Sequence, residues 1–335
     1  MMAVATETAF ELRKLGNSDL MLSPLGLGCW QFSNGKGMVG KFWPVLSQAD
    51  VLKIVQISLQ GGINWFDTAE VYGGGQSEEM LARALKEVGG PVGDHAYIAT
   101  KWWPIFRTAS SIATTIDERL RLLDNRTIHL YQVHQPYSFS SVASEMTAMA
   151  KLVKQGKIKH VGVSNFTAEK MREADRVLRE HGLRLASNQV KYSLLDRRIE
   201  QNGILDTAKE LGVAIIAYSP LEQGILSGKF HKNPALVKSI TGPRKFGAAF
   251  RATGMQKSKP LIDVLEQLAL QYNASPTQIA LNWMIHAHGD TVFAIPGASK
   301  VHHAEENVKA MQFSMTTSEI ATITAVSDQV LRSRK

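Results

Sequence analysis

The fold is decided by the stretch Ile63-Asn64-Trp65-Phe66-Asp67-Thr68-Ala69-Glu70-Val71-Tyr72, in which an acid and a phenol follow a short apolar run. Two further apolar runs end in a similar way, since Lys101 follows residues 97–100 and His134 follows residues 128–133. Short apolar runs bounded by polar residues are typical of buried parallel strands. In a closed barrel of such strands, successive strand ends face one shared pocket. We therefore expect Asp67, Tyr72, Lys101 and His134 to meet there.

Apolar runs of this kind alternate with helical patterns along the chain, which predicts a parallel α/β architecture. Eight candidate strands favour a (β/α)₈ TIM barrel over an open sheet, and Gly26-Leu27-Gly28 lacks the glycine-rich fingerprint of the open type. We expect one domain over residues 1–335, with the barrel at about 25–313 and a C-terminal helical tail at about 314–335. The expected strands are Leu25–Gly28, Ile63–Phe66, Tyr97–Thr100, Ile128–Val133, Lys159–Val163, Ala186–Gln189, Val213–Ala217 and Thr291–Ile295.

Two segments depart from this alternation. An N-terminal β-hairpin is predicted from residues 11–15, a turn at Gly16-Asn17 and residues 20–23, and we expect it to cap one end of the barrel. The segment at 221–260, after the seventh strand, has no strand period and is too long for an ordinary connection. Loops of that size inside compact enzymes are usually lids or ligand clamps.

Helix starts are marked by hydroxyl caps. We expect Ser77 to cap one helix ahead of Glu78 and Glu79, and Ser141 to begin another. The sequence Ser275-Pro276-Thr277-Gln278 is a capping box with proline at the first helical position.

The composition predicts a cytoplasmic protein with no membrane partner. No apolar stretch approaches the roughly 20 residues that a membrane span needs, and residues 1–10 lack the apolar region of a signal peptide. The single cysteine, Cys29, cannot form an internal disulfide, which fits a reducing compartment.

The net charge of +8 is concentrated in residues 229–259, which hold eight Lys or Arg residues and no acid. Such a segment raises the local concentration of an anionic ligand, although a solvated basic loop is the alternative. We expect no nucleic-acid partner, because the segment has no recognisable binding motif and only Phe230, Phe246 and Phe250 as stacking rings. The cations are Lys229, Lys232, Lys238, Arg244, Lys245, Arg251, Lys257 and Lys259.

The four strand-end residues suit proton transfer to a carbonyl. A phenol such as Tyr72, with a pKa near 10, can protonate a forming alkoxide, and a neighbouring ammonium, Lys101, would lower that pKa. Asp67 could orient Lys101 through an ion pair, and His134 could polarise the carbonyl oxygen. Each residue alone is more often structural than catalytic, so the prediction depends on their convergence.

A second set of residues suits a dinucleotide. Ser164 and Asn165 follow the fifth strand and Gln189 closes the sixth, where their donors and acceptors could bind a carboxamide. Tyr218 follows the seventh strand and could stack on a flat ring. Ordinary turn and cap chemistry is the alternative for these residues.

Phosphate sites are expected next to them. Ser299 and Lys300 follow the eighth strand at the start of a predicted helix, where backbone donors favour a phosphate. Backbone N–H groups suited to a pyrophosphate are offered by Ser219, Leu221, Gly224 and Gly228.

Three tryptophans, Trp30, Trp102 and Trp103, follow the first and third strands and could wall an apolar substrate pocket, with packing under a loop as the alternative. We expect no metal site. The histidines at 286, 288, 302 and 303 have no carboxylate or thiol partner at ligand spacing.

These residues together resemble the aldo-keto reductase family. The segments 67–73, Thr100-Lys101 and Gln132-Val133-His134 look like its catalytic motifs. Its cofactor-binding stretches look similar to 162–166, 217–221, 295–299 and Glu306-Asn307, and the similarity covers about 13–313.

The resemblance implies hydride transfer from NADPH, with NADH as the alternative, to a small aldehyde or ketone. It implies Tyr72 as acid/base, assisted by the other three residues, and it places Ser299, Lys300 and His303 around the 2′-phosphate with Glu306 and Asn307 at the adenine. Many members carry Lys and Ser at Gly297 and Ala298 and Arg at His303, so Lys300 becomes the expected cation here. We expect a monomer.

Two alternatives stay open. One is a nucleotide-sensing regulatory subunit similar to the potassium-channel β subunits, although we expect no gating segment ahead of the hairpin. The other is a barrel lyase or isomerase without a nucleotide, against which Asn165, Gln189 and Tyr218 argue.

Overall fold

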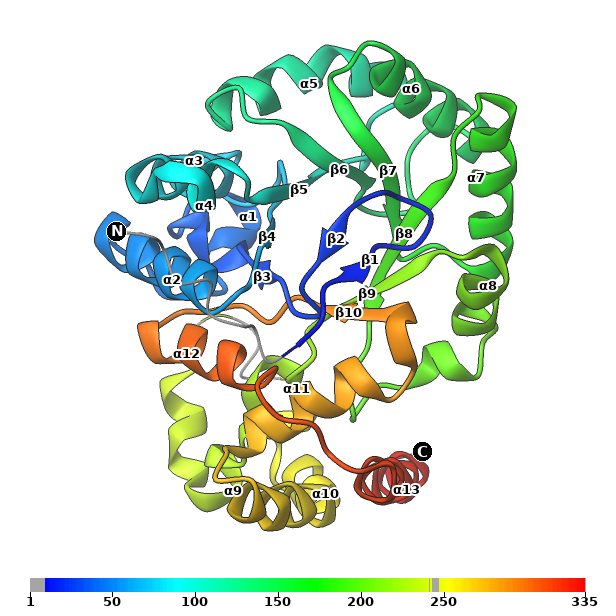
Figure 1. Ribbon diagram of the computed structural model, residues 1–335. Coiled ribbons are helices and arrows are strands. Elements are labelled where there is room, and N and C mark those ends of the chain that lie inside the picture. The colour runs from blue at the N-terminus through cyan, green and yellow to red at the C-terminus, as the bar shows by residue number, and fades with distance from the viewer. Residues whose placement is uncertain (1–9, 241, 243–246, 335) are drawn as a thin grey trace.

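A closed barrel of eight parallel strands forms the centre of the computed structural model, which describes residues 10–240, 242 and 247–334 (Figure 1). The strands follow one another around the barrel in chain order from β3 to β10, and each neighbouring pair is parallel. Parallel bridges between Leu25 and Ala294 and between Gly28 and Gly297 close the seam between the first and last of these strands. The (β/α)₈ barrel expected from the sequence is confirmed.

Each expected strand overlaps an observed one. The ends differ by at most two residues, because polar residues such as Asp67, Lys101 and Ser164 continue the backbone ladder beyond the last apolar side chain. The barrel strands are β3 (Leu27–Gly28), β4 (Trp65–Asp67), β5 (Tyr97–Trp102), β6 (Ile128–Val133), β7 (Ile158–Ser164), β8 (Leu185–Lys191), β9 (Ala214–Tyr218) and β10 (Val292–Ala294).

The N-terminal hairpin closes the bottom of the barrel, as expected. Strands β1 (Arg13–Lys14) and β2 (Met21–Leu22) pair antiparallel and lie across the barrel opening (Figure 1). The hairpin leucines Leu15, Leu20 and Leu22 pack inside the barrel and form an inner core with residues of the barrel strands. These are Trp65, Ala99, Leu130, Ala186, Ala214, Ile216, Phe293 and Ile295. The turn needs Gly16, whose φ is +50° and whose Cβ would meet the Ala186 carbonyl oxygen at 2.4 Å. With this end packed, a ligand can enter only from the opposite end.

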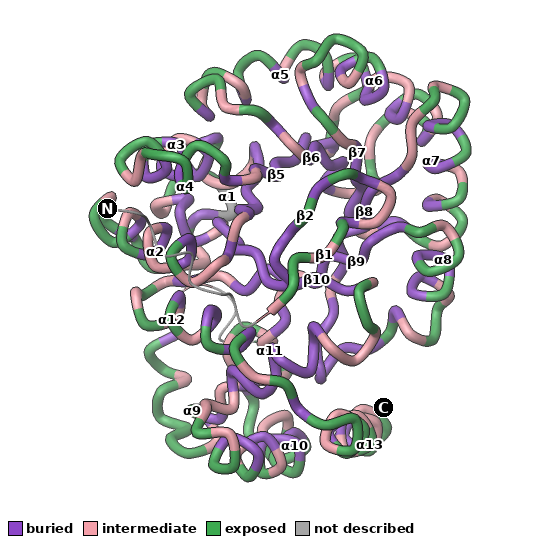
Figure 2. Tube along the Cα trace, viewed as in Figure 1, coloured by how far each residue is buried: buried purple, intermediate pink, exposed green. Residues whose placement is uncertain are grey.

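Helices surround the barrel and bury their inner faces on it, leaving their outer faces exposed (Figure 2). The helices between or after the strands are α1 (Gly37–Gly40), α2 (Gln48–Gln60), α3 (Gln76–Val88), α4 (Gly90–Asp94), α5 (Ser110–Leu122), α6 (Val142–Lys154), α7 (Ala168–Glu180), α8 (Ile204–Leu211), α11 (Pro276–His286) and α12 (Val301–Lys309). Short 3₁₀ turns lie at η1 (Trp30–Ser33), η2 (Arg198–Glu200) and η7 (Gly289–Thr291).

Two of the three expected hydroxyl caps are present. The side chains of Ser141 and Ser275 each accept a hydrogen bond from a first-turn N–H, and Ser275 forms a full capping box with Gln278. The expectation for Ser77 was wrong. Helix α3 starts two residues earlier than expected, after Gly75 with a φ of +90°, and the Ser77 hydroxyl instead donates to the Cys29 carbonyl oxygen at 2.7 Å.

The segment after β9 is not an irregular loop. It forms η3 (Glu222–Ser227), α9 (Lys229–Lys232), η4 (Pro234–Ser239) and η6 (Ala248–Phe250), and it enters the long helix α10 (Ala252–Gln271), which contains Pro260. Two of its cations are paired on α10, Lys232 with Glu266 and Lys259 with Asp263. Arg244, Lys245 and Phe246 lie outside the described residues.

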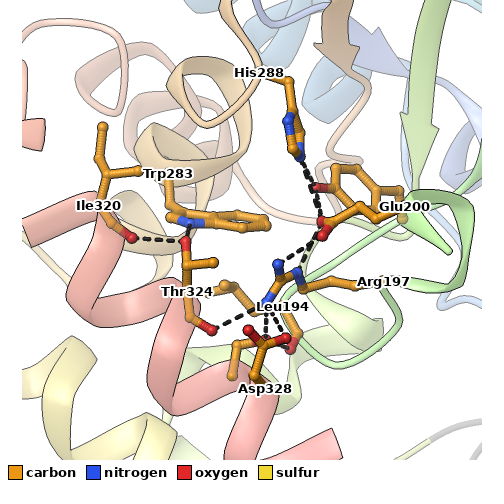
Figure 3. A network of polar contacts seen from close by, with 10 residues as sticks. Leu194, Arg197, Glu200, Trp283, His288, Ile320, Thr324 and Asp328 are labelled. Atoms are coloured by element: carbon orange, nitrogen blue, oxygen red, sulfur yellow. Dashed lines mark hydrogen bonds and ion pairs between the residues drawn. The ribbon is translucent and has the colours of Figure 1, made fainter. Parts of the chain in front are cut away.

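The C-terminal helix α13 (Thr317–Arg334) packs against α10 and is anchored by Arg197 (Figure 3). The Arg197 guanidinium donates to the Thr324 carbonyl oxygen at 3.0 Å and pairs with Asp328 at 2.9 Å and with Glu200 at 2.6 Å. Trp283 on α11 adds a hydrogen bond to the Thr324 hydroxyl at 2.9 Å. A partly buried charge network of this kind is stabilised because each nitrogen of the guanidinium donates to an oxygen.

Candidate active site

An ion pair between Asp67 and Lys101 lies at the open end of the barrel. Both side chains are buried, with exposed fractions of 1% and 0%. The Lys101 ammonium donates to the Asp67 carboxylate and also to the Thr68 carbonyl oxygen at 2.8 Å. Burial alone would lower the pKa of Lys101, but the charge of Asp67 and the hydrogen bond to it, with a further contribution from Tyr72, outweigh burial and leave that pKa raised. Lys101 is therefore a fixed positive charge.

Two buried glutamines hold the second oxygen of Asp67. Gln132 Nε2 donates to Asp67 Oδ2 at 3.0 Å, and Gln189 Nε2 donates to the same oxygen at 2.9 Å and to Gln132 Oε1 at 3.3 Å. Since Gln189 turns its amide nitrogen toward Asp67, its amide oxygen faces away as an acceptor. Gln132 was not among the residues predicted from the sequence. It stands two residues before His134, hence on the same face of β6, and that period-2 spacing could have revealed it.

Tyr72 sits beside this pair, with the Lys101 ammonium 5.0 Å from the centre of its ring. The Trp30 ring stacks on it at a centroid distance of 5.9 Å. The phenol is half-buried and lines the cavity described below. Burial raises the pKa of Tyr72, and the lowering by Lys101, which the sequence suggested would dominate, offsets only part of that rise. The hydroxyl is therefore protonated at neutral pH, as a proton donor must be.

His134 completes the group. Its ring meets Tyr72 edge-on at 5.7 Å and Trp103 at 5.3 Å. Burial, and then the charge of Lys101, holds the pKa of His134 well below its usual value. Its Nδ1 has no hydrogen-bond partner among the residues that the structure describes. The ring is thus a neutral imidazole that can donate or accept a hydrogen bond but carries no charge.

This neutrality predicts the pH profile of a reaction at this site. An ordinary histidine becomes charged as the pH falls through about 6.5, whereas His134 with its lowered pKa stays neutral through that range. We expect kcat/KM to show no acid limb between about pH 5.5 and 8, because the free enzyme's groups that titrate set such limbs. Steady-state rates across this range are the measurement. A limb near pH 6.5 that disappears in His134→Asn would contradict the neutral assignment.

Three of the four side chains line one end of a cavity of about 800 Å³. Lys101 lies directly behind this wall, and Asp67, Tyr72 and His134 form part of it. The cavity also reaches most of the residues predicted to hold a dinucleotide: Ser164, Asn165, Gln189, Tyr218, Ser219, Leu221, Gly224, Ser299, His303, Glu306 and Asn307. The sequence therefore located the walls of one continuous site.

Two of the residues expected at a carboxamide, Ser164 and Asn165, form a hydrogen-bonded cluster with Gln135 and Tyr218. Asn165 Nδ2 donates to Ser164 Oγ and to Gln135 Oε1, both at 3.2 Å, and Tyr218 donates its hydroxyl to Asn165 Oδ1 at 3.1 Å. The backbone of Asn165 is left-handed, with a φ of 60°. Burial raises the pKa of Tyr218 to about 12. Tyr218 is thus held as a neutral ring on the cavity wall.

The far end of the cavity is lined by Ser299, His303 and Asn307. Asn307 is 2% exposed, and its Nδ2 has no hydrogen-bond partner in the described chain. An unmet buried donor of this kind fits a polar ligand group. Burial and the neighbouring His302 lower the pKa of His303 to about 4, so this ring is uncharged near neutral pH.

Two residues expected at this end do not line the cavity. Lys300 is exposed at the start of α12 and is not part of the cavity wall, although its charge contributes to the lowered pKa of His303, and its place at the 2′-phosphate stays a prediction. Gly228 begins α9 with a φ of +75° and faces Glu266, so it serves the turn instead. Two other lysines line the cavity, Lys191 at the end of β8 and Lys229 from the basic segment. The basic segment has no repeating residue pattern that indicates which of its cations faces the cavity.

Two of the three predicted tryptophans line the cavity, and the third points to the other face of the barrel wall. Trp30 and Trp103 line the cavity. The backbone N–H of Trp103 donates a hydrogen bond to Glu70 Oε2 at 3.0 Å. Trp102 faces outward, fully buried with its Nε1 donating to Ser111, so its expected pocket role was wrong. Lys101 and Trp103 share one face of β5 and Trp102 the other. The sequence missed Trp43, which lines the cavity edge-on to Trp30 at 5.8 Å.

Comparison with known proteins decides the family. The model of the Aldo/keto reductase family matches residues 24–328. The chain belongs to this family. A probable aldo-keto reductase from Glycine max is 28% identical to it over 326 residues, 95% of this chain and 89% of the relative. An uncharacterized oxidoreductase from Mycobacterium bovis is 33% identical over 295 residues, 88% of this chain and 86% of the relative.

Solved structures agree with this aldo/keto reductase fold. The glycerol dehydrogenase from Gluconobacter oxydans is 29% identical with a TM-score of 0.81, over 97% of this chain and 96% of that one. A thermostable aldo-keto reductase in complex with the inhibitor epalrestat is 28% identical with a TM-score of 0.73, over 94% and 99% of the two chains. The protein is an oxidoreductase of a family that acts on small molecules with NAD(P)H.

Two absences hold for the described part of this aldo/keto reductase. It has no cluster of three or more His, Cys, Asp or Glu side chains arranged to hold a metal ion. None of its described helices combines the length and the apolar character needed to cross a bilayer. Cys29, the free cysteine, is fully buried.

Proposed function

We propose that this enzyme reduces an aldehyde or ketone with NADPH and that Tyr72 supplies the proton. The observation that carries the proposal is one cavity of about 800 Å³ with two different ends. One end holds a protonated phenol, with a buried ammonium 5.0 Å from the centre of its ring and a neutral imidazole at a centroid distance of 5.7 Å. The other holds small polar side chains and a lysine.

The residues of the cavity fit a nicotinamide dinucleotide. When bound, this cofactor supplies the hydride. Ser164, Asn165 and Gln189 would hold its carboxamide, and the outward-facing amide oxygen of Gln189 suits an N–H donor. Tyr218 offers a ring face for stacking. The unmet Asn307 Nδ2 suits the acceptors of a purine.

The phosphate end supports NADPH over NADH. Lys229 and Ser299 both line the cavity there, and the first is close enough to His303 to lower its pKa. A 2′-phosphate between them would gain a charge-assisted contact that NADH cannot make. The neutral His303 adds a hydrogen bond but no charge.

At the reacting end, each residue has a separate task. The Tyr72 hydroxyl donates its proton to the carbonyl oxygen as negative charge develops there. Lys101 lies 5.0 Å from the Tyr72 ring and stabilises the phenolate that remains. Asp67, held by Gln132 and Gln189, keeps Lys101 in place. His134 hydrogen-bonds the carbonyl oxygen and orients it. Stacked Trp30 and the edge of Trp103 exclude water from this end.

The proposal is tested by titrating the protein with NADPH and NADH and following the oxidation of each nucleotide with a panel of aldehydes and ketones. We expect quenching of protein fluorescence by both, tighter binding of NADPH by at least about tenfold, equivalent to 1.4 kcal/mol, and carbonyl-dependent turnover. Binding without turnover on any carbonyl would favour a nucleotide-sensing subunit. The absence of binding would favour a nucleotide-free lyase or isomerase.

A further inference from the structure

A buried amide that the mechanism does not use lies on the cavity wall. Gln31 is in η1, directly after β3, and its side chain is 7% exposed. It lines the cavity, yet its Oε1 has no hydrogen-bond partner in residues 10–240, 242 and 247–334. A buried polar atom without a partner costs free energy, so its retention on a ligand-facing wall calls for a ligand group.

The space for this amide is left open by a glycine on the opposite side of the barrel seam. A Cβ built on Gly297 would lie 2.3 Å from both Nε2 and Oε1 of Gln31. The amide therefore occupies the space that any side chain at 297 would fill. The backbones around the two residues are joined as well, because Gly28 pairs with Gly297 and donates to the Pro296 carbonyl oxygen at 3.1 Å.

The neighbours of the two residues define which part of a dinucleotide lies here. Gln31 follows Trp30, whose ring stacks on Tyr72 at the reacting end. Gly297 stands two residues before Ser299 at the phosphate end. The amide thus lies between the two ends of the cavity. In an extended dinucleotide that span is the ribose–diphosphate bridge, which offers hydroxyl donors and phosphate oxygens.

We propose that Gln31 binds the ribose–diphosphate bridge of the nucleotide, with Oε1 accepting from a ribose hydroxyl, and that Gly297 is the positioning residue for this contact. The inference rests on the proposed function, since it requires a dinucleotide in the cavity. An amide both donates and accepts, so it matches a bridge that carries both kinds of group.

The test measures the Kd of NADPH and of NADH by fluorescence titration, together with the Tm of the ligand-free protein. Gln31→Met keeps the side-chain length and removes the polar group. We expect both Kd values to rise by roughly tenfold, the effect of losing one well-placed hydrogen bond, and by the same factor, because the two nucleotides share the bridge. The Tm of the ligand-free protein should not fall, since an unmet polar atom is removed from the wall.

A double-mutant cycle tests the role of Gly297. Gly297→Ala should displace the amide and weaken nucleotide binding about as much as Gln31→Ala does. In the Gln31→Ala background, where the amide is gone, Gly297→Ala should have little further effect. If Gln31→Met folds poorly, Gln31→Asn keeps an amide but draws it back from the ligand and should give the same rise in Kd.

The outcomes are distinct. Unchanged Kd values in the Gln31 variants, or additive effects of the two alanine substitutions, overturn this inference and leave the proposed function standing. A larger loss for NADPH than for NADH places Gln31 at the 2′-phosphate and overturns the assignment to the bridge. If the wild-type protein binds neither nucleotide, the proposed function fails, and this inference fails with it.

Discussion

Tyr72→Phe is expected to lower kcat for carbonyl reduction by about 10²–10⁴-fold, the usual contribution of a positioned general acid. The phenylalanine ring keeps the stacking on Trp30 and the edge contact with His134, so only the hydroxyl is lost. The Kd of NADPH should stay within about twofold of wild type, because the hydroxyl is assigned to the substrate and not to the nucleotide. Single-turnover reduction and fluorescence titration measure the two quantities separately.

The matched control is Tyr218→Phe, which removes a second phenolic hydroxyl from the same cavity. That hydroxyl donates to Asn165, so its loss should weaken nucleotide binding severalfold and leave the chemical step nearly intact. Equal single-turnover rates for wild type and Tyr72→Phe would remove Tyr72 from its proposed role. A greater loss of the chemical step in Tyr218→Phe would transfer that role to the other phenol.

Lys101→Met should abolish turnover and also destabilise the fold. The substitution leaves the Asp67 carboxylate buried, with only the amides of Gln132 and Gln189 as partners. Breaking a buried ion pair from one side typically costs about 3–5 kcal/mol. The free energy of unfolding, from urea titration at neutral pH, should fall by that amount.

The double variant Lys101→Met/Asp67→Asn separates stability from catalysis. It removes both charges and keeps the oxygen that accepts from the two glutamines, so more than half of the lost stability should return. Turnover should not return, because the ammonium beside Tyr72 is still missing. Recovered turnover in the double variant would mean that Lys101 acts only as a counter-ion for Asp67 and has no part in tuning the phenol.

Much of the site could be predicted because it lies at strand ends. Asp67, Lys101 and His134 each follow an apolar run, and barrel closure brings such ends together whatever the details of packing. The same logic explains one omission and one error on these strands. Gln132 shares a face with His134, and Trp102 takes the face opposite Lys101, so period 2 would have corrected both. Trp43 has no such signal, because it lies on a connection between elements.

The sequence alone did not predict which cation lies at the phosphate end of the cavity. Lys300 and Lys229 both lie near His303, and nothing in the sequence indicates which of the two side chains faces the cavity. Only the course of η3 and α9 turns Lys229 into the cavity and leaves Lys300 at the surface. The segment after β9 has no repeating pattern from which the inward-facing positions could be predicted. Its course depends on contacts with residues that are distant in sequence.

The sequence by itself determined the barrel, the chain order of its strands and the four polar residues gathered at its open end. These follow from local alternation and from the geometry that every closed parallel barrel shares. The tertiary structure alone decided that Tyr72 keeps its proton, that Lys229 is the cation of the basic segment that faces the cavity and that the Gln31 amide rests on Gly297. Each of these depends on burial or on a contact across the barrel, and neither quantity is carried by the spacing of residues along a chain.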